Sequence, residues 1–147
     1  MRILLRNSAV LGWKTHNDKI RLKLVGLGAE VISSPYAPSL LQKAQIKPYG
    51  KVFGALRVPL VSPIRMSERT APTTLPEQLD VIYAASHIGL GGLEHAATRR
   101  IATVDACIPQ VVAEFGARHF TKKDVNDEER VLSQCDAILC MSEWTMN

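Results

Sequence analysis

The sequence is most constrained by an alternation between short segments with few charges and longer segments with helical spacing. The short segments cover residues 2–5, 29–33, 80–85, 101–104 and 137–141, and each has the apolar character of a buried strand. Strands that are apolar along their length are typical of parallel sheets, which helices cover on both faces. The alternation therefore predicts an α/β fold: a Rossmann-like three-layer domain with a mostly parallel sheet.

The helical segments follow from the spacing of apolar residues. Between residues 17 and 27, Ile20, Leu24 and Leu27 recur at intervals of four and three, which places them on one helix face. Gly28 follows them and predicts a left-handed helix end. Two further helices are predicted, over residues 92–99 and 126–135.

The middle of the chain has a weaker pattern. Seven prolines punctuate residues 35–76, and only residues 52–61 have strand character there. We expect residues 62–76 to form a long loop. The sequence has no internal repeat, and its 147 residues are the size of one domain, so we expect a single domain over residues 1–147.

Positive charge is concentrated in the first half of the chain. Residues 1–75 carry a formal charge of +9, whereas residues 76–147 carry −5. This asymmetry favours a face that meets an anionic surface or ligand, although scattered, solvated charge explains it equally well. Four basic residues form a candidate face for anionic lipid headgroups: Lys43, Lys47, Lys51 and Arg57.

The cysteines indicate a reducing compartment. The sequence contains three, an odd number, and no C-x-x-C pair, which indicates neither a disulfide framework nor a thiolate metal site. The first apolar run, residues 3–5, is broken by Arg6 and is too short for a signal peptide or a membrane span. We therefore expect a cytoplasmic location, with at most a peripheral contact with the inner face of the membrane.

Candidate site residues lie where the predicted strands end. In open parallel sheets, ligands bind beyond the carboxyl ends of the strands. After the first strand, Gly12, Trp13 and Lys14 fall in a predicted loop over residues 11–15, where Lys14 either directs its charge at a ligand or stays solvated. His87 follows a later strand and is either a ligand contact or a plain loop histidine.

Two more strand ends carry candidate residues. Residues 89–92, Gly-Leu-Gly-Gly, precede a predicted helix, so Gly89 and Gly91 either let backbone amides approach an anion or begin a flexible helix. The dinucleotide fingerprint G-x-G-x-x-G is absent, because Glu94 occupies the position of the third glycine. Asp105 is a candidate catalytic residue, whose carboxylate either accepts hydrogen bonds from hydroxyl groups or takes a proton as a general base; alternatively it caps a turn. No spacing of histidines predicts a metal site.

Three motifs together resemble one known family. The first is a strand, a loop with Gly12 and a helix that closes on G-x-E-V at residues 28–31. The second is the D-V-I-x strand of residues 80–83. The third is the E-R pair at residues 129–130 followed by CDAILCMSEW at residues 135–144, which is similar to E-R…A-D-x-I-x-x-S-x-W. On these motifs the chain resembles the N-terminal domain of retaining glycosyltransferases of the GT-B fold, in the family 4 group.

The resemblance implies that the whole enzyme transfers a sugar from a nucleotide-sugar donor to a glycan or lipid-linked acceptor, as in polysaccharide biosynthesis. In this family the N-terminal domain mainly holds the acceptor, and a C-terminal domain binds most of the donor. No segment of this chain corresponds to that second domain. We therefore expect one half of a GT-B architecture, inactive in isolation, with its partner domain in cis or on a separate subunit, and no tightly bound cofactor.

Only some of the family's functional positions carry over. Gly12, Asp105 and, with less force, Ser142 match them, whereas Trp144 is interpreted as a packing residue. Family members commonly carry a double glycine where this chain has only Gly12. Many also carry a histidine where this chain has Asp105.

Two other classes of function remain as alternatives. A small, self-contained α/β protein would bind a nucleotide or a cofactor through residues 89–92. A nucleic-acid-binding module fits the positive charge, but the chain has only eight aromatic residues and no recognisable nucleic-acid motif. We therefore do not expect nucleic acid as a partner.

Overall fold

A computed structural model describes residues 1–8, 11–36, 62–93, 95–115 and 120–141. The elements in chain order are β1 (Arg2–Ser8), α1 (Leu11–Gly26), β2 (Glu30–Tyr36), α3 (Pro63–Arg69), β3 (Val81–Ala84), the 3-10 helix η1 (His87–Leu90), β4 (Arg99–Val104), α4 (Ile108–Phe115), α5 (Lys122–Ser133) and β5 (Ala137–Cys140).

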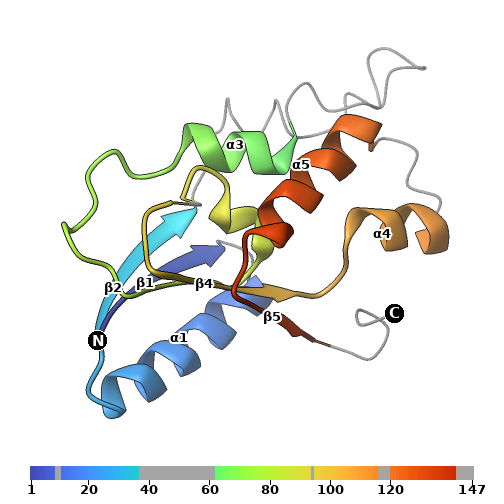
Figure 1. Cartoon of the computed structure of the whole chain (residues 1–147). Coiled ribbons are helices and arrows are strands. Elements are labelled where there is room, and N and C mark those ends of the chain that lie inside the picture. Colours follow the sequence, from blue (N-terminus) through green and yellow to red (C-terminus); the bar gives the residue numbers. More distant parts are fainter. Residues whose placement is uncertain (9–10, 37–61, 94, 116–119, 142–147) are drawn as a thin grey trace.

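The described strands form one sheet in the order β2-β1-β3-β4-β5, and every neighbouring pair is parallel. Figure 1 shows α1 on one face of this sheet, and α3 and α5 on the opposite face. The predicted α/β fold, a Rossmann-like three-layer domain with a parallel sheet, is confirmed.

The side chains of β1 alternate between the two faces of the sheet. Ile3 and Leu5 are buried on the side of α1. Leu4 is buried on the other side, among apolar residues of α3, η1 and α5. Arg6 has the same parity as Leu4, and it too is buried. A charged side chain therefore lies in the layer between the sheet and α3.

Helix α1 begins at Leu11, six residues before the predicted start. The predicted loop over residues 11–15 is therefore wrong, and residues 12–14 belong to the first turn of the helix. A glycine within a helix costs only about 1 kcal/mol relative to alanine, and no proline interrupts this segment. The predicted left-handed helix end is confirmed, because Gly28 has a φ of +81°.

The segment after η1 also differs from the prediction. Turns lead from η1 to β4, which begins at Arg99, so the predicted helix over residues 92–99 is wrong. Gly92 has a φ of +80°, which an α-helix does not allow. A Cβ atom on Gly91 would lie 2.6 Å from the backbone oxygen of Ile64. The glycines thus let this turn fit tightly against α3.

Helix α3 lies inside the predicted loop over residues 62–76. The hydroxyl oxygen of Ser62 accepts a hydrogen bond from the amide of Arg65, at 3.2 Å, and Pro63 occupies the first turn. Both are signals of a helix start. Helix α4 follows β4 in a segment for which we predicted no helix.

Helix α5 begins at Lys122, four residues before the prediction, because Thr121 and Asp124 form a capping box. The predicted strand over residues 52–61 lies outside the described residues. Among the helices of the described ranges, none is long and apolar enough to cross a membrane.

Candidate functional site

The strand order locates a switch point at the carboxyl edge of the sheet. From β1 the chain crosses to β2 on one side, and it later returns to β3 on the other side of β1. The connections that leave β1 and β3 therefore diverge, and α/β sheets bind ligands in the crevice at such a point. Two adjoining pockets open at this edge, one on either side of η1, and Ile88 lines both.

The first pocket, called here the switch-point pocket, is lined by Arg6, Tyr36, Ser86, Ile88 and Gly89. Its volume is about 40 Å³. A single water needs about 10–15 Å³ of such space, so this pocket holds a group of only a few heavy atoms. The switch-point pocket lies between the ends of β1 and β2 and the segment that follows β3.

Arg6 is the charged group of the switch-point pocket. Arg6 is buried, with only 2% of the residue exposed. Nη1 donates hydrogen bonds to Ser34 Oγ at 2.9 Å and to the carbonyl of Pro35 at 3.2 Å, and Nη2 donates to the carbonyl of Thr70 at 3.1 Å. Nε is buried and has no partner within the described part of the chain. The guanidinium also lies 5.8 Å from the ring centre of Tyr36.

The partners of Arg6 do not neutralise its charge. They are carbonyl and hydroxyl oxygens, and no carboxylate of the described residues lies within ion-pair distance of the guanidinium. Burial lowers the pKa of Arg6 from its ordinary value, because the charged form loses water. An arginine remains protonated in proteins even so. The guanidinium of Arg6 is therefore a buried positive charge at the switch point.

The second pocket, called here the His87 pocket, has a volume of about 180 Å³ and lies between η1, α3, α4 and α5. Its lining is mostly apolar, and its polar groups come from Ser62, His87, Asp124 and Glu128. A mostly apolar pocket with a few polar groups is the usual form of a small-molecule site.

His87 and Glu128 form a buried pair in this pocket, with 6% and 3% of each residue exposed. His87 Nε2 lies 2.7 Å from Glu128 Oε1, an ion-pair contact without hydrogen-bond geometry. Glu128 Oε2 accepts a hydrogen bond from the amide of Ile108, at 2.7 Å, at the start of α4. His87 Nδ1 is buried and has no partner among the described residues. It is therefore a polar atom that a ligand hydroxyl could satisfy.

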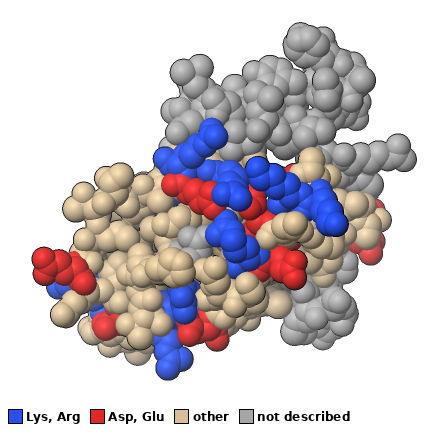
Figure 2. Space-filling view, turned by 45° about the horizontal axis from the view of Figure 1, so that its top comes forward, with Lys and Arg blue, Asp and Glu red and all other residues tan. Residues whose placement is uncertain are grey.

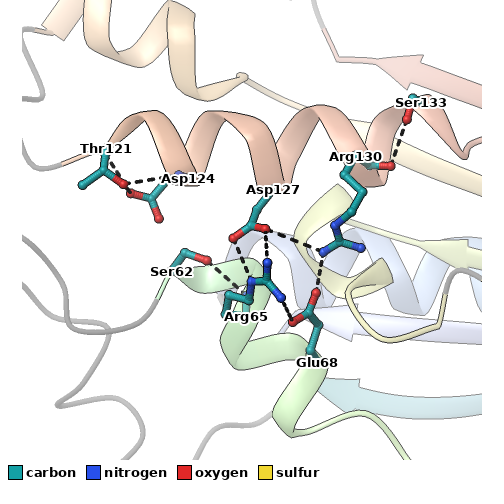
Figure 3. A network of polar contacts seen from close by, with 8 residues as sticks. All are labelled: Ser62, Arg65, Glu68, Thr121, Asp124, Asp127, Arg130 and Ser133. Carbon is teal, nitrogen blue, oxygen red and sulfur yellow. Dashed lines mark hydrogen bonds and ion pairs between the residues drawn. The ribbon is translucent and has the colours of Figure 1, made fainter.

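Two ion pairs hold the helices that wall the His87 pocket (Figure 3). Arg65 of α3 binds Asp127 of α5 through two contacts, Nε to Oδ2 at 2.9 Å and Nη2 to Oδ1 at 2.7 Å. Arg130 of α5 contacts Glu68 of α3 in turn. The hydrogen bond that Arg65 donates to the Asp127 carboxylate raises the pKa of Arg65. The residues of this network connect α3 to α5, so they position the pocket walls.

The predicted glycines have two different roles. Gly89 lines the switch-point pocket, and a Cβ atom there would lie 3.0 Å from Cγ of Arg6. Gly91 instead packs against Ile64. The predicted anion-binding helix start is absent, since turns rather than a helix follow Gly91.

The other predicted residues lie at the same edge of the sheet or beyond the described part. Gly12, Trp13 and Lys14 lie in the first turn of α1, which follows the carboxyl end of β1. Asp105 comes directly after β4, where it is exposed, and the next residue lines the His87 pocket. Ser142 lies outside the described residues. The structure thus brings His87 and Gly89 to adjoining pockets.

Arg6 and Glu128 are the site residues that sequence reasoning missed. Arg6 left a signal, because it is a charge that directly follows the apolar run of residues 3–5. Glu128 left another, because α5 buries acidic residues at helical spacing: Asp124, Asp127 and Glu128. A polar stripe at the spacing of a buried face indicates buried partners.

The comparisons with known proteins add nothing to this geometry. No family model, no curated protein and no solved structure matches the chain. Within the described ranges, no three histidine, cysteine, aspartate or glutamate side chains gather in a group that could hold a metal ion.

Proposed function

We propose that this chain is the acceptor-binding half of a glycosyltransferase that moves a sugar from a nucleotide-sugar donor to a glycan or lipid-linked acceptor. The observation that carries the proposal is the His87 pocket at the carboxyl edge of the sheet, where Rossmann-like domains bind ligands. The resemblance of the motifs to family 4 glycosyltransferases supports the same function. A C-terminal domain, in cis or on another subunit, would supply most of the donor contacts.

The lining of the His87 pocket suits a saccharide. A sugar presents both C–H faces and hydroxyl groups, and the pocket offers both apolar walls and isolated polar atoms. The unpartnered Nδ1 of His87 would bond a hydroxyl group, while Glu128 holds the other side of the ring. Asp105 stands beside the pocket on the end of β4 and remains our candidate catalytic residue.

The resemblance implies a mechanism that retains the anomeric configuration without a protein nucleophile. The bond between the anomeric carbon and the leaving phosphate oxygen breaks, and the acceptor oxygen forms a bond to the same face of that carbon. The acceptor proton passes to the leaving phosphate. This chain would contribute by positioning the acceptor, which is a major part of such catalysis.

A cytoplasmic location with a peripheral contact with anionic membrane is also part of the proposal. Within the described residues, Cys107, Cys135 and Cys140 form no disulfide, as a reducing compartment favours. The basic residues proposed to contact lipid, Lys43, Lys47, Lys51 and Arg57, lie outside the described residues. Cosedimentation with anionic liposomes, but not with neutral ones, would support this contact, and equal binding to both would contradict it.

A matched pair of histidine variants tests the acceptor site. Calorimetric titration of the chain with a panel of neutral mono- and disaccharides should find a binder whose affinity falls about tenfold or more in His87→Gln, since a buried polar partner is lost. His95→Gln, at an exposed histidine five residues from η1, should bind as the parent chain does.

The same titration separates the alternative function. A small nucleotide- or cofactor-binding protein would also use the switch point of the sheet. Micromolar binding of nucleotides or dinucleotides, with no saccharide bound and no effect of His87→Gln, would contradict the glycosyltransferase proposal and favour that alternative.

A further inference from the structure

The switch-point pocket contains a buried cation that the fold does not explain. Arg6 lies inside the sheet layer at the end of β1, where an apolar residue would serve packing equally well or better. Its charge meets only neutral acceptors among the described residues, and its Nε–H has no acceptor. Buried charges in proteins are usually paired with an opposite charge.

The surroundings of Arg6 leave room for such an opposite charge. The pocket beside it is lined by Tyr36 and Ser86 as well as by Arg6, and each of these residues carries a polar side chain. Ser86 is the N-cap residue of η1, but its hydroxyl does not cap that helix. Helix α1 also begins at this edge of the sheet, and its first turn contains no acidic residue.

Gly89, which has no side chain, also leaves space in the switch-point pocket. Gly89 lies where a Cβ atom would come within 3.0 Å of Cγ of Arg6, so any side chain would press on the arginine. The acidic residues of the two pockets, Glu128 and Asp124, line the His87 pocket and not the switch-point pocket.

We infer that the switch-point pocket binds a single small oxyanion, a phosphate or a carboxylate group, through Arg6 and Ser86. The volume of about 40 Å³ suits one such group and not a nucleotide diphosphate. We expect the oxyanion to be a group of the bound acceptor, an assignment that rests on the proposed function.

The first test uses inorganic phosphate and the parent chain. In a ¹⁵N NMR titration at constant ionic strength, the Nε–H resonance of Arg6 and the amides of Ser86 and Gly89 should shift together. The shifts should saturate by about 20 mM phosphate, as expected for a millimolar site. If these resonances do not move, or move only linearly as chloride also moves them, the inference is wrong.

Variants of the same strand give a matched comparison. Arg6→Gln should weaken phosphate binding at least about tenfold, because a charge-assisted bond is lost. Arg2→Gln removes the same charge from the other end of β1, where Arg2 pairs with Glu30 at 3.0 Å, and should leave phosphate binding unchanged. Equal phosphate affinity in Arg6→Gln would overturn the inference.

Two milder variants keep the test decisive if Arg6→Gln does not fold. Ser86→Ala should weaken phosphate binding about fivefold, the effect of one hydrogen bond. Gly89→Ala should weaken it as well, since the added Cβ crowds Arg6. Circular dichroism would verify that each variant is folded, and unchanged phosphate binding in both folded variants would contradict the inference.

A last comparison separates this inference from the proposed function. Glucose 6-phosphate and glucuronate should bind more tightly than glucose, and only their advantage should disappear in Arg6→Gln. Phosphate binding at Arg6 without any saccharide binding would leave the oxyanion site standing and remove the acceptor function. Saccharide binding at His87 with no response of Arg6 to phosphate would support the acceptor function and overturn the oxyanion site.

Discussion

Single residues at the carboxyl edge explain why the two pockets exist. Gly89 lets η1 approach Arg6, and Gly91 lets the following turn approach α3. The sequence drew attention to both glycines as a phosphate-binding turn, but it could not show that Gly91 meets a backbone oxygen of a helix far away in the chain. The sequence identified the glycines as notable, but the reason why residue 91 must be a glycine is a tertiary contact.

A pair of glycine variants tests whether Gly91 is needed for packing against α3. Gly91→Ala should destabilise the chain by about 2–3 kcal/mol, because the Cβ would lie 2.6 Å from a backbone oxygen that cannot move without shifting α3. Urea unfolding followed by circular dichroism measures the difference. Gly26→Ala, where the Cβ would meet no atom within 4 Å, is the control and should cost nothing. Equal free energies of unfolding for both variants would contradict the packing role.

The helices and strands were predictable to different extents. The apolar strands were found from sequence, because an apolar run is a local signal that needs no knowledge of partners. Burial on both faces explains this run in β1 and β3, whereas β5, which we also expected to be buried, is exposed along its length. Helix α3 was missed although Ser62 and Pro63 mark its start, because the surrounding prolines suggested a loop. Glu128 was missed because its partners, His87 of η1 and the amide of Ile108 in α4, lie far from it in the sequence. Sequence spacing alone cannot identify such partners.

The contact between α3 and α5 leads to a prediction at the scale of elements. Asp127→Ala would leave Arg65 without its two contacts and should lower the free energy of unfolding by about 2–3 kcal/mol, below the usual 3–5 for a buried pair because the Arg65 side chain is 44% exposed. The control is Glu30→Ala, which breaks the exposed pair with Arg2 and should cost less than about 1 kcal/mol. Equal losses in urea unfolding would show that the network does not anchor α5.

On the face shown in Figure 2, the described residues do not display the charge split of the sequence as a single basic surface. Figure 2 shows acidic and basic side chains interleaved on the face turned to the viewer. Basic residues of the first half bind acids across the fold, as Arg65 does with Asp127 of the second half. Arg6, another basic residue of the first half, lines the switch-point pocket at the carboxyl edge of the sheet.

The central claim is that ligands bind at the carboxyl edge between β1, β3 and β4. The most direct measurement is an NMR map of the amide shifts caused by glucose 6-phosphate in the parent chain. We predict that the largest shifts lie at Ser86, His87 and Gly89, next to the two pockets. Shifts concentrated instead in the open groove lined by Cys107, Leu132 and Ile138, or the absence of any shift at η1, would contradict the claim.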